Sequence, residues 1–129
     1  MIKSRKIDHI GLAVPNVEID AKWYQDILGF SILGKFRGNN GSSVYFLSNG
    51  ESIYEMYQEE NMDPKTVGKI DHISLVSTDI EADYRFCVSQ NYIISTDGIE
   101  NIPNFWDHGI RYFKIVSPTG EQIEFCQKL

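Results

Sequence analysis

Two histidines stand at equivalent places in a repeated sequence motif. Ile7-Asp8-His9-Ile10-Gly11-Leu12 returns 63 residues later as Ile70-Asp71-His72-Ile73-Ser74-Leu75. A single histidine in a strand is usually structural, but two histidines at matching places in a repeat are typical of a shared ligand site. Imidazole suits nickel, cobalt, zinc, manganese and iron. The repeat therefore predicts that His9 and His72 bind one divalent metal ion.

Two glutamates complete the candidate ligand set. Glu124 lies between the apolar residues Ile123 and Phe125, so strand alternation gives it the same inward direction as the histidines. A carboxylate buried there needs a cationic partner, because an isolated buried charge is very costly. Glu55 is its counterpart in the first half of the chain.

The direction of Glu55 is not decided by alternation, because both faces of its strand carry apolar or aromatic residues. The repeat is also uneven, since Gly50 precedes Glu55 by five residues and Gly120 precedes Glu124 by four. A bulge or a longer turn would reconcile the two copies. Without one, Tyr54 would take the inward position.

These four residues predict a catalytic metal centre. Two histidines and two glutamates leave about two positions open on a six-coordinate ion, where a substrate with adjacent oxygens can chelate. The ion would act as a Lewis acid, and a ligating glutamate could loosen and serve as a base. We therefore expect His9, Glu55, His72 and Glu124 to bind the metal, and Glu124 and Glu55 to be catalytic.

The elements around the histidines form two β-α-β-β-β modules. Asn16 and Gly29 bound the first expected helix, in which Val17, Ala21, Tyr24 and Leu28 share a face, and Thr78 or Asp79 caps the second, where Ile80, Tyr84 and Cys87 match. Turn residues separate the strands at Asn39-Asn40-Gly41, Asn49-Gly50 and Pro118-Thr119-Gly120. The expected later strands are roughly Phe30–Phe36, Ser43–Leu47 and Ser52–Gln58, then Tyr92–Asp97, Ile110–Ser117 and Gln122–Gln127.

The modules span about residues 5–58 and 70–129, and the polar stretch of about 59–69, with Pro64 and Gly68, is the expected linker. One helix only partly covers a sheet face, so we expect the modules to pair as a single domain over residues 1–129. The predicted fold is α+β, with a curled eight-stranded mixed sheet around a metal cavity. The helices would cover the outer face, and both histidines would point inward.

Composition narrows the class of protein. The formal charge is −6 without a basic stripe, which argues against nucleic-acid and anionic-membrane partners. No signal peptide or membrane-spanning run is visible, so we expect a cytoplasmic protein with a small-molecule substrate. The two cysteines, Cys87 and Cys126, are expected to be reduced and buried. Trp23 and Tyr24 are expected in the core, and His108 in a plain loop.

The segments Ile7–Asn16 and Trp23–Phe30 resemble the opening of the glyoxalase/bleomycin resistance/dioxygenase superfamily, also called the vicinal oxygen chelate superfamily, and Ser117–Phe125 resembles its closing signature. The resemblance spans nearly the whole chain. Members similar to glyoxalase I (lactoylglutathione lyase) use a His-Glu-His-Glu set in the order seen here. It implies a metal-dependent lyase or isomerase acting on an α-oxoaldehyde thiol hemithioacetal, such as that of methylglyoxal, through an enediolate. Glu124 or Glu55 would then move the proton from C1 to C2.

The same resemblance leaves other members of the superfamily open. Methylmalonyl-CoA epimerases resemble this chain at the first motif but typically carry Gln where Glu55 stands. Extradiol dioxygenases need two histidines and one carboxylate on iron, which His9, His72 and Glu124 could supply, though those enzymes are usually longer. Bleomycin-resistance proteins bind antibiotics without catalysis and commonly lack the ligands. Many members form homodimers. An anionic thiol such as glutathione would want local cations, and the candidates are Lys35, Arg37, Arg111 and Lys114.

Overall fold

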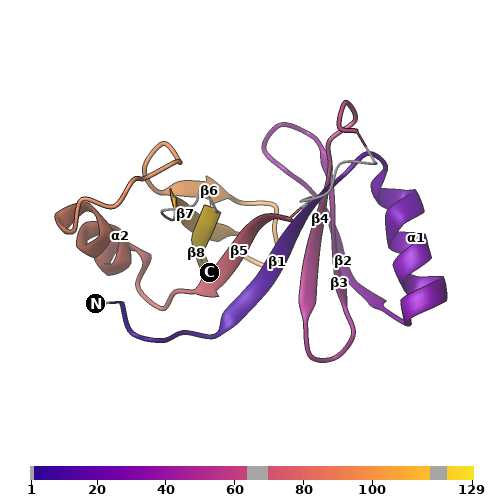
Figure 1. The fold of residues 1–129 in the computed structure, drawn as a ribbon, viewed down its shortest axis with the longest axis horizontal. Coiled ribbons are helices and arrows are strands. Elements are labelled where there is room, and N and C mark those ends of the chain that lie inside the picture. Colours follow the sequence, from indigo (N-terminus) through magenta and orange to yellow (C-terminus); the bar gives the residue numbers. More distant parts are fainter. Residues whose placement is uncertain (1, 64–69, 117–121) are drawn as a thin grey trace. The chain divides into compact units, whose positions relative to one another are not determined.

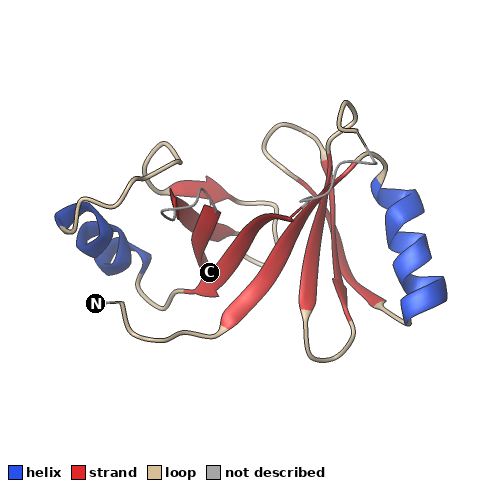
Figure 2. Ribbon diagram, in the orientation of Figure 1, coloured by secondary structure: helices blue, strands red, loops and turns tan. Residues whose placement is uncertain are grey.

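The computed structural model describes residues 2–63, 70–116 and 122–129 (Figures 1 and 2). The first module contains β1 (Ile7–Val14), α1 (Val17–Leu28), β2 (Ser31–Arg37), β3 (Ser43–Ser48) and β4 (Ile53–Gln58). The second contains β5 (Ile70–Val76), α2 (Ile80–Ser89), β6 (Glu100–Ile102), β7 (Ile110–Val116) and β8 (Gln122–Lys128). The expected linker residues 64–69 and the expected turn Pro118-Thr119-Gly120 lie outside the described residues.

The expected fold class, α+β with a mixed eight-stranded sheet, is confirmed. In the first module the strand order is β2-β3-β4-β1, and in the second it is β5-β8-β7-β6. In each module the histidine-bearing strand pairs in parallel with the last strand, and the remaining pairs are antiparallel. The repeat seen in the sequence is therefore also a repeat of strand pairing.

Contacts divide the chain into two compact units. One is His9–Asp71, and the other joins His72–Leu129 to the N-terminal residues as far as Asp8. The short segment before His9 therefore packs with the second module, although it precedes the first in the sequence.

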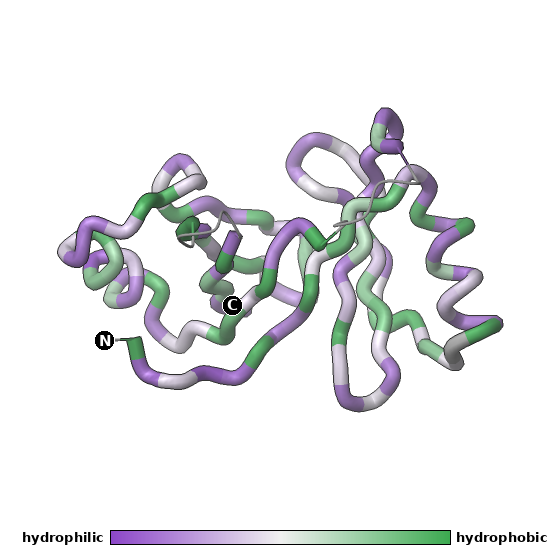
Figure 3. The backbone as a smooth tube through the Cα atoms, viewed as in Figure 1, coloured by the Kyte–Doolittle hydropathy of each residue, from purple (hydrophilic) through white to green (hydrophobic). Residues whose placement is uncertain are grey.

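In the first module, α1 packs on one face of its sheet. Asn16 caps the helix by accepting a hydrogen bond from the Ile19 N–H at 3.1 Å, and Gly29 ends it with a positive φ of 71°, as expected. Figure 3 shows hydrophilic residues interrupting the hydrophobic ones along this helix. The core between helix and sheet contains Val14, Val17, Ala21, Phe30, Tyr45, Leu47 and Met56, with Tyr24 packed against it.

Trp23 is exposed, so its expected place in the core is wrong. Its side chain is 52% exposed, and Ile19 and Ile27 are exposed as well. These three residues are four positions apart and share a face that α1 turns away from its core. Tyr24, one position further along the helix, meets the core at Phe30 and Tyr54.

In the second module, α2 also covers one face of its sheet. Asp79, rather than Thr78, caps the helix by accepting a hydrogen bond from the Ala82 N–H at 3.0 Å. The core between them contains Ile80, Cys87, Phe113 and Phe125. Cys87 and Cys126 are buried and form no disulfide with each other, as expected. Burial raises the pKa of the Cys87 thiol, and the charge of Asp83 adds to this shift while that of Arg5 opposes it.

The strand expected at Tyr92–Asp97 is absent, and a short β6 follows instead. Ile94 forms only an isolated bridge with Ile115. The pairing fails because the Thr96 hydroxyl, rather than a backbone carbonyl, accepts the Lys114 N–H, and Gly98 then turns the chain with a φ of 64°. The sequence pattern correctly predicted an extended segment beside β7 but placed its regular pairing several residues too early.

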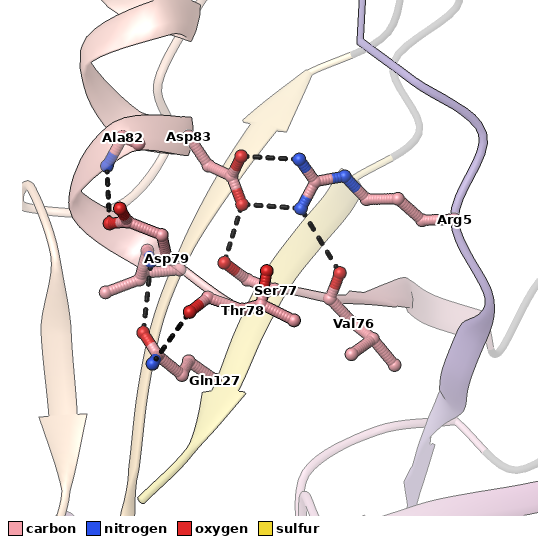
Figure 4. Close-up of polar contacts among 9 residues, drawn as sticks. Arg5, Val76, Ser77, Thr78, Asp79, Ala82, Asp83 and Gln127 are labelled. Carbon is pink, nitrogen blue, oxygen red and sulfur yellow. Dashed lines mark hydrogen bonds and ion pairs between the residues drawn. The ribbon is translucent and has the colours of Figure 1, made fainter.

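The N-terminal arm is tied to the second module by Arg5 (Figure 4). Its guanidinium donates two hydrogen bonds of 2.5 Å to the Asp83 carboxylate of α2 and a third, of 3.3 Å, to the Val76 carbonyl. The Ser77 hydroxyl also donates to Asp83, at 2.6 Å. No helix of the described residues has the length and apolar character needed to span a membrane.

Candidate metal centre

In the first module, His9 and Glu55 form a buried pair on the sheet face opposite α1. His9 lies on β1 and is 2% exposed, while Glu55 lies on β4 and is 8% exposed. The His9 Nε2 and Glu55 Oε2 atoms are 3.4 Å apart. The two side chains meet because β1 and β4 are parallel neighbours.

The second module builds the same pair from His72 on β5 and Glu124 on β8. These side chains are 3% and 4% exposed. The His72 Nε2 and Glu124 Oε2 atoms are 3.6 Å apart. Here too the strands are parallel neighbours, and the helix-facing residue Phe125 belongs to the opposite face.

The question left by the sequence, which way Glu55 points, has a clear structural answer. Glu55 is in register with Gly11, two residues after His9, and Glu124 is in register with Ser74, two residues after His72. The β3–β4 register runs without a shift from Val44↔Tyr57 to Ser48↔Ile53, so Glu55 reaches the histidine face without a bulge in β4. Tyr54 points to the helix side, where it packs with Tyr24 and Phe30.

The donor atoms in each pair fit a shared metal ion. Two ligand atoms about 2.1 Å from one ion lie about 3.0 Å apart at a right angle and about 3.4 Å apart at a tetrahedral angle. The separations of 3.4 and 3.6 Å are close to these values and longer than most N–H···O hydrogen bonds. Imidazole with carboxylate is also a donor set that borderline divalent metals accept. Whether both pairs bind one ion remains a prediction.

The surroundings of the two pairs differ. In the first module, Glu55 is flanked by Gly11 on β1 and Phe46 on β3. The Phe46 ring meets the His9 ring edge-on, with centroids 5.5 Å apart, and Phe36 packs on Phe46 at 5.9 Å. The His9–Glu55 pair therefore lies against an aromatic wall, which sequence reasoning missed because a register shift in β2 hides which residues face inward.

In the second module the flanking positions are polar. Glu124 has Ser74 beside it on β5 and Lys114 opposite it on β7. Ser74 is fully buried, and its Oγ atom has no hydrogen-bond partner among the described residues. Ser74 follows His72 by two residues and so lies on the same face of β5, but the sequence could not show that its hydroxyl is unsatisfied.

The aspartate before each histidine is held by a polar contact. Asp71 accepts a hydrogen bond of 2.9 Å from the Tyr57 hydroxyl, and Asp8 lies 3.5 Å from the Lys128 ammonium. Burial, followed by the charge of Asp71, raises the pKa of Tyr57 well above its ordinary value. The Tyr57 hydroxyl therefore stays protonated and keeps donating to Asp71 at neutral pH.

Of the four cations considered for an anionic thiol, Lys114 is the one in register with a proposed ligand. Lys35 is exposed and stacks on Tyr45, a core residue on the helix side. Arg37 is exposed and donates to the Gly41 carbonyl. Arg111 pairs with Glu81 of α2. His108 lies in an exposed turn before β7, in agreement with its prediction as a plain loop residue.

Comparison with known proteins gives consistent matches along the whole chain. The sequence model of the Glyoxalase/Bleomycin resistance protein/Dioxygenase superfamily matches residues 6–125. An uncharacterized protein of Bacillus subtilis, YwbC, is 30% identical over 97% of this chain and 99% of its own length.

Solved structures with the same architecture include a hypothetical protein from Bacillus halodurans, which has a TM-score of 0.78 at 26% identity over 98% of this chain and 96% of its own. Methylmalonyl-CoA epimerase from Mycobacterium tuberculosis has a TM-score of 0.76 at 18% identity, covering 100% of this chain and 93% of its own. At that identity the likeness to the epimerase shows a shared fold.

Proposed function

This chain belongs to the Glyoxalase/Bleomycin resistance protein/Dioxygenase superfamily, and from that premise we propose that it is a metal-dependent lyase or isomerase of the glyoxalase I type. Its two modules would act as one domain over residues 1–129. His9, Glu55, His72 and Glu124 would hold one divalent ion, and the substrate would be the hemithioacetal of an α-oxoaldehyde and a thiol. A homodimer, which is common in this superfamily, is part of the proposal.

The observation that carries this proposal is the duplicated, buried histidine–glutamate pair. Burying a carboxylate and an imidazole together away from water is unfavourable unless their polar groups are compensated. This chain does so twice, with the same register and nearly the same donor separation. A repeated unfavourable arrangement is expected where function requires it.

The chemistry assigned to the site is a proton shift between adjacent carbons. A bound divalent ion would polarise the two neighbouring substrate oxygens as a Lewis acid. Glu124 or Glu55 takes the proton from C1 and returns it to C2, so the hemithioacetal becomes a 2-hydroxy thioester without any oxidant or second reactant. His9 and His72 would hold the ion through their Nε2 atoms.

The experiment is metal analysis of the purified protein, followed by isomerase assays with nickel, cobalt, zinc, manganese and iron. Methylglyoxal is supplied with glutathione, which is anionic, or with 2-mercaptoethanol, which is neutral. We expect activity that depends on the metal and disappears in His72→Ala. His108→Ala is the matched control, because His108 is exposed in a turn and should leave metal content and activity unchanged.

Failure of the assay has distinct meanings. Racemisation of an acyl-CoA without isomerase activity would favour an epimerase, although Glu55 stands where epimerases typically carry Gln. Oxygen consumption with a catechol would favour a dioxygenase. A protein that takes up no metal but binds a cationic antibiotic would be a sequestering protein. Each of these results would contradict the glyoxalase proposal.

A further inference from the structure

Ser74 is a buried polar residue whose hydroxyl makes none of the hydrogen bonds described for the fold. Its side chain is fully buried, and its Oγ atom has no hydrogen-bond partner among the described residues. Leaving a hydroxyl unsatisfied in the interior is unfavourable, so such a group calls for an explanation. Ser74 is in register with Glu124 on the face that also carries His72, which places its hydroxyl beside the proposed ligands.

Lys114 occupies the other flank of Glu124. The two residues are direct partners in the antiparallel β7–β8 ladder, so their side chains project from the same face, with Cβ atoms about 5 Å apart. Among the described residues, Glu100 is the other acidic group on this face. It lies two strands away from Glu124, and the Tyr112 hydroxyl donates to it at 2.6 Å. A lysine and an unsatisfied hydroxyl thus flank the same proposed ligand.

We propose that Ser74 and Lys114 form a subsite for an anionic oxygen group of the substrate, of the carboxylate class. The Ser74 hydroxyl donates a hydrogen bond to the anion, and the Lys114 ammonium supplies the countercharge. The subsite rests on the proposed function, because it needs a substrate that chelates the neighbouring ion. Within the proposed substrate class, the subsite favours an α-oxoaldehyde that also carries a carboxylate.

The first module supports this assignment by contrast. Gly11 and Phe46 occupy the positions that correspond to Ser74 and Lys114. Neither can bind an anion through its side chain, and the Phe46–Phe36 wall suits an apolar substituent. Of these matched positions, those of the second module are therefore the ones that can form a polar subsite.

The test compares two hydroxamates that differ in one group. Both chelate a metal through adjacent oxygens, but succinic monohydroxamate ends in a carboxylate where butyrohydroxamate ends in a methyl group. Their dissociation constants are measured by calorimetry on the metal-loaded protein, so no turnover is needed. We expect the carboxylate to improve binding about tenfold or more, as is typical of hydrogen bonds to charged groups. Ser74→Ala and Lys114→Met should each remove most of this preference.

Ser77→Ala is the matched control for Ser74→Ala. Ser77 is also buried, but its hydroxyl donates to Asp83 at 2.6 Å, so its role is structural. We expect Ser77→Ala to lower the melting temperature and keep the ligand preference. Ser74→Ala should keep the melting temperature, because it removes a hydroxyl that the fold leaves unsatisfied.

The failures can be told apart by measuring the bound metal first. Equal affinity for the two hydroxamates in the loaded protein would overturn the subsite and leave the metal centre standing. A Ser74→Ala variant that keeps the full preference would remove Ser74 from the subsite and overturn the assignment. Absence of bound metal would overturn the proposed function, and the subsite with it.

Discussion

The two modules share a backbone plan but differ on the face that carries the histidine and glutamate. Module one surrounds its pair with Gly11 and an aromatic wall, whereas module two surrounds its pair with Ser74 and Lys114. On the helix-facing side, by contrast, both modules are apolar. The repeat has kept what folds each module and what would bind metal, while the positions beside the ligands have diverged.

The largest expected effect comes from comparing the two carboxylates. Glu124→Gln should weaken metal binding more than about a hundredfold. Losing a metal ligand should cost more affinity than losing a residue that hydrogen-bonds to a ligand, which typically costs about 10–100-fold. It also leaves the Lys114 charge beside the ion. Glu55→Gln should cost less, because the residues in register with Glu55, Gly11 and Phe46, are uncharged and an amide oxygen can still ligate. Metal titration against a chelating indicator gives both constants, and a larger loss in Glu55→Gln would reverse the comparison.

We expect the aromatic wall of module one, formed by Phe46 and Phe36, to stabilise the folded protein. Phe46 is 1% exposed, so Phe46→Ala should lower the free energy of unfolding by about 3–5 kcal/mol through cavity formation. Lys114→Met, at the corresponding position of module two, should change it by only about 0.5 kcal/mol. Urea denaturation of the metal-free protein measures both. Equal losses of unfolding free energy in the two variants would mean that the histidine-bearing faces of the two modules contribute equally to stability.

Module two should depend on its N-terminal arm. Arg5→Ala leaves Asp83, whose side chain is 13% exposed, with a hydrogen bond from Ser77 but without its guanidinium partner. We expect a loss of about 1–3 kcal/mol, less than for a fully buried pair because solvent reaches Arg5. Arg111→Ala is the control, because its pair with Glu81 is more exposed and should contribute at most about 1 kcal/mol. Equal effects on unfolding would show that the arm adds no special stability.

The smallest effect concerns the contact between Tyr57 and Asp71. The pKa of Tyr57 is raised in the folded protein, so its contribution is complete below the unfolded value of about 10 and is lost as the pH rises above it. Tyr57→Phe should therefore be slightly less stable at pH 7 but show a flatter decline between about pH 10 and 11. Unfolding curves across that range test this, and parallel declines in the two proteins would exclude it.

Local rules predicted most of the fold. Asn16 and Gly29 marked both ends of α1, because capping and a positive φ depend on neighbouring residues alone. The predictions for Trp23 and for a strand at Tyr92–Asp97 were wrong, because both depend on tertiary contacts. An aromatic residue does not reveal which helix face meets a sheet, and the hydrogen bond from the Lys114 N–H to Thr96 is set by packing.

The repeat made the candidate site partly predictable. It drew attention to His9 and His72, and alternation gave Glu124 its direction. Glu55 could not be oriented from the sequence, because its direction depends on the register in which β4 pairs with β1 and β3. The unsatisfied hydroxyl of Ser74 could not be predicted either, since hydrogen bonding depends on which groups come close in space.

The number of metal ions per chain tests the central claim most directly. Native mass spectrometry of the metal-loaded protein should show one divalent ion per chain, and both His9→Ala and His72→Ala should lose it. Two ions per chain, each lost in only one of these variants, would mean that each histidine–glutamate pair binds its own metal ion. That result, or a protein that binds no metal, would contradict a single site built from both modules.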